Sequence, residues 1–144
     1  MDKNSFFART MHTPDSPERA ELRAALRDIS KALIPLHRHL IDAAKSDYAF
    51  AYDVDASPSQ LIELLQNDPF FAWLRPLTAL IVDIDEMARR DFDEVSVLAI
   101  PKRVEEMFGV EQYVTILQRD VEVAGAHAAV RKTLQRLTNS SGRG

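Results

Sequence analysis

One apolar stripe constrains the fold of this chain more than any other feature. Between Pro17 and about Tyr48, apolar residues recur at alternating intervals of four and three: Leu22, Leu26, Ile29, Leu33, Leu36, Leu40 and Ala43. This spacing is typical of one face of an α-helix. Pro35 lies inside the stripe and predicts a kink, because proline removes one helical hydrogen bond and crowds the preceding turn.

Three proline dipeptides predict where helices begin: Ser16-Pro17, Ser57-Pro58 and Asp68-Pro69. In each, the first side chain can accept a hydrogen bond from an unpaired backbone N–H, and proline tolerates the first helical position. The stretch "SPSQ" adds Gln60 at the third helical position, which completes a capping box. We expect a helix from Pro58 to about Gln66, after a connection made by "AFAYDVDA".

The next predicted helix starts at Pro69 and carries the apolar stripe Phe70, Leu74, Leu77, Ile81, Ile84 and Ala88. At about 100° per residue, this helix places Phe70 and Trp73 in the core and Phe71 against the preceding short helix. Arg75 projects outward, where its stem packs under the 49–57 connection. A functional alternative makes Trp73 one wall of a ligand pocket.

The second half of the chain is also predicted to be helical. We interpret "DFDEVSVLAIPKRVEEMFG" as a helix that breaks or kinks at Pro101 and ends at Gly109. A last helical stretch spans about Glu111 to Leu137, with a break near "RDVE" and Asp120 as a second cap. The predicted fold is therefore all-α, an antiparallel bundle of five to six helices with proline-kinked long helices. Its domain spans 16–138, between a mobile arm at 1–15 and a disordered tail at 139–144.

Composition excludes several function classes. With 46% hydrophobic residues, 28% charged residues and a net charge of −4, the chain is typical of a globular protein and lacks the basic character of a nucleic-acid binder. It has no cysteine, which excludes disulfides and thiol chemistry. No apolar run has signal-peptide or membrane-spanning character. We expect a cytoplasmic, soluble protein without membrane or nucleic-acid partners.

The search for catalytic motifs is negative. The chain has no glycine-rich phosphate loop, no nucleophile elbow and no H-E-x-x-H pair. Helical bundles that carry two iron ions need Glu-x-x-His pairs, and the residues three before each histidine are Arg9, Ile34, Leu36 and Ala124. The sequence therefore predicts no catalytic residue, no metal site and no cofactor.

Two histidines on inner helix faces are the main candidates for a binding site. His37 lies about 40° from Leu33 in the stripe, and His127 lies about 60° from Val130 on the last helix. Together with Asp85, Asp47 and Tyr48 they could converge on a pocket that binds a metal or a small molecule. The structural alternative is that each histidine is an isolated boundary residue with one hydrogen bond.

The N-terminal arm and one long run carry the remaining signals. Phe6 and Phe7 are aromatic residues in a polar segment, which predicts docking on the bundle or on a partner. The run "DPFFAWLRPLTALIVDID", with "IPLHRHLIDA" before it and "LQRDVEVAGAHAAVRK" after it, resembles a family of small uncharacterised bacterial all-helical proteins. The resemblance covers roughly residues 34–134. It implies a helical fold and a bacterial cytoplasmic origin, and it assigns no catalytic residue.

Two function classes remain open. The first is a non-catalytic module that binds a protein partner or forms a homodimer, and the sequence favours it because the stripes leave few inward polar positions. The second is a small-ligand or metal-binding bundle, including an enzyme, that uses the two inward histidines. The first predicts a filled core, whereas the second predicts a polar pocket reached by both His37 and His127.

Overall fold

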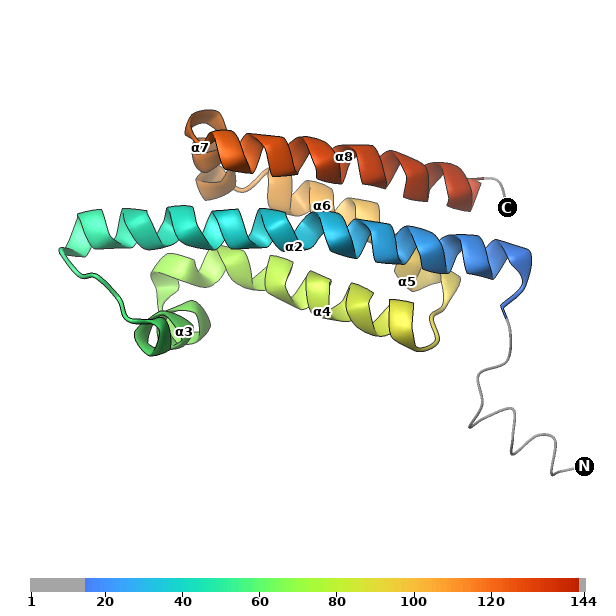
Figure 1. Cartoon of the computed structure of the whole chain (residues 1–144), viewed down its shortest axis with the longest axis horizontal. Coiled ribbons are helices and arrows are strands. Elements are labelled where there is room, and N and C mark those ends of the chain that lie inside the picture. The colour runs from blue at the N-terminus through green and yellow to red at the C-terminus, as the bar shows by residue number, and fades with distance from the viewer. Residues whose placement is uncertain (1–14, 143–144) are drawn as a thin grey trace, which may run out of the picture.

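The computed structural model describes residues 15–142, and every regular element within them is helical (Figure 1). In chain order the elements are α2 (Pro17–Tyr52), α3 (Pro58–Asn67), the 3₁₀ helix η1 (Pro69–Leu74), α4 (Arg75–Arg89), α5 (Glu94–Leu98), α6 (Ile100–Phe108), α7 (Glu111–Arg119) and α8 (Val121–Gly142). The predicted all-α class is confirmed. Helix α8 continues past residue 138, where the sequence predicts the tail to begin.

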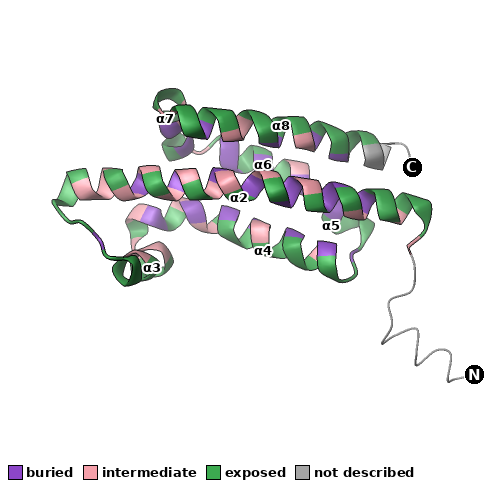
Figure 2. Cartoon of the chain, viewed as in Figure 1, coloured by how far each residue is buried: buried purple, intermediate pink, exposed green. Residues whose placement is uncertain are grey.

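The long helix α2 is the central element of the fold. It packs against α8 on one side and α4 on the other, so both of its flanks are partly covered (Figure 1). Figure 2 colours the buried residues of the ribbon, and in α4 and α8 they fall mainly on the side that is turned toward α2. Buried residues of α2 follow the predicted stripe, with Ala44 in place of Ala43. The helix includes Pro35 and extends past Tyr48 to Tyr52.

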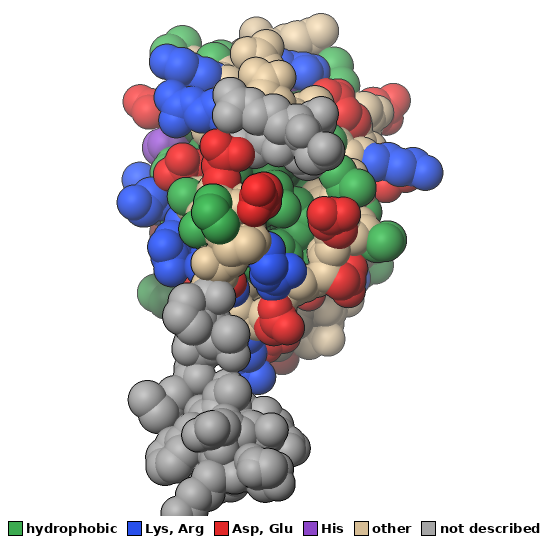
Figure 3. All heavy atoms as spheres, turned by 90° about the vertical axis from the view of Figure 1, so that its right-hand side faces the viewer, with side chains coloured by type: hydrophobic (Ala, Val, Ile, Leu, Met, Phe, Trp, Pro, Cys, Tyr) green, Lys and Arg blue, Asp and Glu red, His purple; other side chains and the backbone are tan. Residues whose placement is uncertain are grey.

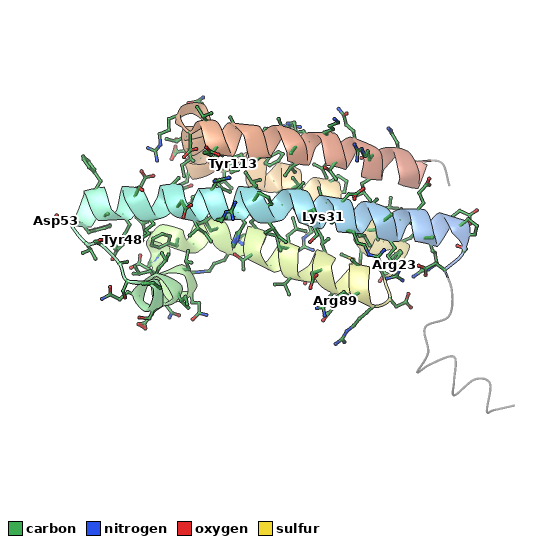
Figure 4. The ribbon with its side chains drawn as sticks, viewed as in Figure 1. Arg23, Lys31, Tyr48, Asp53, Arg89 and Tyr113 are labelled. Atoms are coloured by element: carbon green, nitrogen blue, oxygen red, sulfur yellow. The ribbon has the colours of Figure 1, made fainter. Side chains whose placement is uncertain are left out.

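Local capping bonds begin the helices where the sequence predicts. The Ser16 hydroxyl accepts a hydrogen bond from Arg19 N at 3.2 Å. Ser57 and Gln60 form the reciprocal capping box, with bonds of 3.3 and 2.8 Å. Helix α2 ends as Asp53 enters the left-handed region at φ 55°, and Figure 4 shows this residue at the tip of the helix.

The segment 69–74 differs from its prediction, because it forms a 3₁₀ helix and not the first turns of an α-helix. A 3₁₀ helix turns by about 120° per residue, so side chains three apart eclipse each other. Phe71 therefore falls in line with Leu74 and is fully buried, whereas Phe70 and Trp73 share another face and are half-buried. Phe70 and Trp73, which the sequence places in the core, therefore pack against the core as partly buried residues and are not fully enclosed in it.

The breaks in the second half of the chain are confirmed. Helices α5 and α6 meet at Ala99, and Pro101 lies in the first turn of α6, where proline is tolerated. Asp120 separates α7 from α8, and its side chain accepts a hydrogen bond from Val123 N at 3.1 Å. Gly109 follows α6 with φ −89°, so this helix ends without a left-handed residue.

Arg23 ties the N-terminal part of α2 to the end of α4 (Figure 4). Its guanidinium donates to the backbone carbonyls of Met87, Ala88 and Arg90 at 3.2, 2.9 and 2.6 Å, and to the Asp15 carboxylate at 2.7 Å. The last carbonyls of a helix have no partner within the helix, so Arg23 supplies donors that α4 lacks. At this end of the molecule, exposed apolar side chains lie among charges of both signs (Figure 3).

Candidate functional site

His37 lies at the contact between α2 and α4. Its Nε2 is 2.8 Å from the Thr78 hydroxyl, and burial lowers the pKa of His37 below its usual 6.5. Thr78 in turn donates to the Leu74 carbonyl at 3.3 Å. The neutral imidazole and the hydroxyl satisfy each other's hydrogen bonding. The residues around this pair are mainly apolar.

A groove of about 460 Å³ opens beside this pair. We call it the α2–α3–α4 groove, since its walls come from those helices and from the last residue of η1: His37, Ile41, Ile62, Leu65, Leu74 and Thr78. Ile62 is 58% exposed although it lies in the wall. The groove falls within the size range of about 300–1,000 Å³ that is usual for ligand pockets, and its lining suits apolar groups.

Arg75 holds the α3 wall of the groove in place. Its Nε donates to the Leu65 carbonyl at 3.0 Å, and its guanidinium donates to the Asp68 carbonyl at 2.8 Å. The predicted packing of Arg75 under the 49–57 connection is therefore replaced by a cap on the end of α3. This contact joins α3 to the start of α4 and so fixes the spacing of two groove walls.

His127 belongs to a different cluster, made by α6, α7 and α8. Arg131 Nε donates to His127 Nε2 at 3.1 Å, and His127 Nδ1 lies 2.6 Å from the Tyr113 hydroxyl. Since a guanidinium only donates, Nε2 is the acceptor and the imidazole proton sits on Nδ1. Arg131 also donates to Glu105 at 3.2 Å, and its guanidinium lies 5.1 Å from the Phe108 ring centre.

The surroundings of His127 and Tyr113, at the centre of this cluster, favour the neutral form of both side chains. Burial lowers the pKa of His127, the nearby Arg131 charge lowers it further, and Glu105 opposes this shift. Burial also raises the pKa of Tyr113 above its usual 10. Figure 4 shows Tyr113 on α7, on the side that faces the bundle. The cluster is filled by the chain's own donors and acceptors, so it acts as a polar link between three helices.

The five predicted site residues do not meet in one pocket. His37 contacts α4, whereas His127 contacts α7 and α8. Asp85 pairs with Arg89 at 2.9 Å, Asp47 pairs with Arg119, and Tyr48 packs against Tyr52, Phe70 and Phe71. The physical reason is the rotation of α2 about its axis: the flank toward α8 carries His39, which lies 3.8 Å from the Glu122 carboxylate, whereas His37 lies on the flank toward α4.

The remaining observations concern metal ligands, the two N-terminal phenylalanines and membrane crossing. The described part of the chain brings no three Asp, Glu, His or Cys side chains close enough to hold a metal ion. Phe6 and Phe7 lie outside the described residues. Within residues 15–142, none of the helices combines the length and hydropathy that a bilayer crossing requires. The groove could not be predicted from the sequence, because its α3 wall meets α2 and α4 only through tertiary contacts.

Comparisons with family models, curated proteins and solved structures find no match to this chain. The resemblance to a bacterial all-helical family therefore stays a prediction. What this chain does has to be inferred from its own geometry.

Proposed function

We propose that this chain is a non-catalytic helical module that holds an amphipathic helix of a second polypeptide in the α2–α3–α4 groove. The observation that carries the proposal is the apolar lining of the groove, to which Ile41, Ile62 and Leu65 contribute together with the His37–Thr78 pair. Helix-in-groove binding uses such a surface, with anchors one or two turns apart on the bound helix.

The apolar surface continues along the seam between α2 and α4. These helices run in opposite directions, because His37 contacts Thr78 while Arg23 contacts Ala88. Ile34 precedes His37 by one turn, and Val82 follows Thr78 by one turn, so both extend the groove toward the same end. Their exposed fractions are 53% and 59%. The strip from Ile34 to Ile41 spans about 10 Å, which is two turns of a bound helix.

Charges on the rim indicate the chemistry of the bound helix. Lys31 and Arg38 are exposed residues of α2, and Figure 4 shows Lys31 on this helix. Lys31 precedes Ile34 by three residues and Arg38 follows it by four, so helical spacing puts both beside the strip that Ile34 extends. A bound helix with acidic residues on one flank would place them beside these cations. Such rim charges mainly set orientation and association rate, whereas burial of the apolar anchors supplies the affinity.

A library of amphipathic helical peptides displayed for selection against the whole chain tests the proposal. We expect selected peptides to carry apolar residues spaced three, four and seven apart, and to bind with a dissociation constant on the order of micromolar. Ile62→Asp should weaken binding about tenfold or more, because a charge would enter the apolar wall. Ile62 is largely exposed, so the variant should fold, which circular dichroism checks.

Val95→Asp is the matched control, since Val95 is 78% exposed on α5 and lies outside the groove. It should leave peptide binding unchanged. Equal weakening by both variants, or by neither, would remove the groove as the binding site. Sedimentation velocity of the whole chain covers self-association: a dimer that Ile62→Asp dissociates would make a second copy, and not a foreign helix, the occupant.

A further inference from the structure

A second cavity, of about 250 Å³, lies between α2, η1 and α7. We call it the Trp73 pocket. Its lining includes Phe70 and Trp73 of η1, Asp47 of α2, and Glu111 and Thr115 of α7. It shares none of its lining with the α2–α3–α4 groove. The Trp73 pocket is therefore a separate candidate site, and its ligand has to be inferred from its own residues.

The aromatic wall of the pocket follows from the 3₁₀ conformation of η1. Residues three apart eclipse each other in a 3₁₀ helix, so Phe70 and Trp73 project to the same side, and both stay half-buried. Phe70 is held in place by ring contacts to Tyr48 and Phe71, with centroids 5.3 and 5.2 Å apart. Its backbone N–H also donates to the Asp68 carboxylate at 2.9 Å. Contacts within the chain therefore fix this aromatic wall, and no ligand is needed to form it.

Two carboxylates face the aromatic wall from other helices. Asp47 is paired with Arg119, which joins the C-terminal half of α2 to α7. Glu111 is exposed in the first turn of α7 and has no hydrogen bond or ion pair with any residue that the structure describes, so no cation within residues 15–142 pairs with its charge. With two carboxylates and one guanidinium, the pocket carries a net charge of about −1. It combines an uncompensated negative charge with aromatic rings.

We propose that the Trp73 pocket binds an organic ammonium group, carried by a small free amine or by a lysine side chain of a partner. Carboxylates and aromatic rings both attract such a cation, and the ring interaction contributes about 0.5–2 kcal/mol. A divalent metal ion would need more oxygen ligands than one free carboxylate supplies. The volume lies just below the range of about 300–1,000 Å³ for drug-sized ligands, which suits an ammonium head and a few methylene groups.

Trp73 is the only tryptophan of the chain, so its fluorescence reports directly on the pocket. The whole chain is titrated with tetramethylammonium chloride and, separately, with the amide of acetyl-lysine. Sodium chloride at equal ionic strength controls for screening, and tert-butyl alcohol is the neutral analogue of the quaternary ammonium. We expect a saturable change of Trp73 emission with millimolar affinity for the ammonium compounds only.

Two matched variants locate the charge that matters. Glu111→Gln keeps the shape of the side chain and should weaken ammonium binding about fivefold or more, because it removes the free carboxylate. Glu106→Gln removes an exposed carboxylate of α6 outside the pocket and should leave the affinity unchanged. Circular dichroism confirms that both variants are folded.

The titrations distinguish the two sources of the ammonium group and also test the proposal itself. Tighter binding of the lysine amide identifies a partner's lysine as the source, and tighter binding of tetramethylammonium identifies a small free amine that is fully methylated at nitrogen. An equal response to tert-butyl alcohol or to sodium chloride, or no saturable response from the folded chain, would overturn the proposal. An affinity that Glu111→Gln leaves intact would overturn it as well. None of these results depends on the α2–α3–α4 groove.

Discussion

Replacing Arg23 by alanine should lower the free energy of unfolding by about 3 kcal/mol. The Arg23 side chain is only 13% exposed and donates to three backbone carbonyls at the end of α4 and to the Asp15 carboxylate. A hydrogen bond to a charged group contributes about 1.5–3 kcal/mol. These hydrogen bonds share one charge, however, so their sum overestimates the effect.

The contacts that Arg23→Ala removes, and their partial exposure to water, set the size of the expected loss in the free energy of unfolding. Truncation leaves the carbonyls of Met87, Ala88 and Arg90 without the donor that they have in the native protein. It also removes the nearer of the two arginines that pair with Asp15. Breaking a fully buried ion pair costs about 3–5 kcal/mol. Water can reach part of this end of the molecule once the side chain is gone, so the loss should fall at the lower end of that range.

Urea unfolding followed by circular dichroism measures the effect. For a domain of this size a loss of about 3 kcal/mol shifts the midpoint by roughly 1–3 M urea. Arg27→Ala is the matched control, because Arg27 is exposed one turn further along the same helix, and it should change stability by less than about 0.5 kcal/mol. The guanidinium carbon of Arg23 lies 5.1 Å from the Phe92 ring centre. Arg23→Met keeps a long apolar side chain at this position and so isolates the polar part of the loss. A difference below about 1 kcal/mol between Arg23→Ala and Arg27→Ala would refute the reasoning.

Four further predictions can be tested with the same unfolding assay. Trp73→Ala should cost about 1–3 kcal/mol because the side chain is half-buried, and a loss above 4 kcal/mol would place it in the core. Stability should fall as the pH drops below about 6.5, because the unfolded chain then binds protons that half-buried His37 and His127, with lowered pKa values, do not. His37→Gln and His127→Gln should each flatten this dependence between about pH 7.5 and 5.5, and an unchanged slope would contradict the shifts. Asp53→Ala should cost about 1 kcal/mol more than Asp53→Gly, because φ is 55°. Asp120→Ala should cost about 1 kcal/mol through loss of the α8 cap, and no loss would make the cap incidental.

Much of the fold could be predicted because its signals are local. Ser57 and Gln60 form their capping box within four residues, and Asp120 caps α8 through a bond to the third residue after it. Such bonds form as soon as the helix does, whatever packs around it. The apolar stripe of α2 is equally robust, since its 3.6-residue period holds wherever the neighbouring helices lie.

The candidate site could be predicted only in part. The inner position of His37 agrees with its half-buried contact to Thr78, but its partner could not be known from a stripe. The predicted meeting with His127 fails because the two flanks of α2 face different helices, and the flank toward α8 carries His39. The Trp73 pocket depends on a 3₁₀ turn at 69–74, which periodicity at 100° per residue does not reveal.

The sequence by itself determined the helical class, most helix starts and the stripe of α2, because bonds between residues three or four apart settle these features. The tertiary structure alone decided which side chains share a surface: Ile41 with Ile62 in the α2–α3–α4 groove, and Trp73 with Glu111 in the pocket. Those pairs come from helices far apart in the chain, and their proximity depends on how each helix is rotated about its axis. A rotation of one helix by a single residue, about 100°, changes every such pair while leaving the local pattern intact.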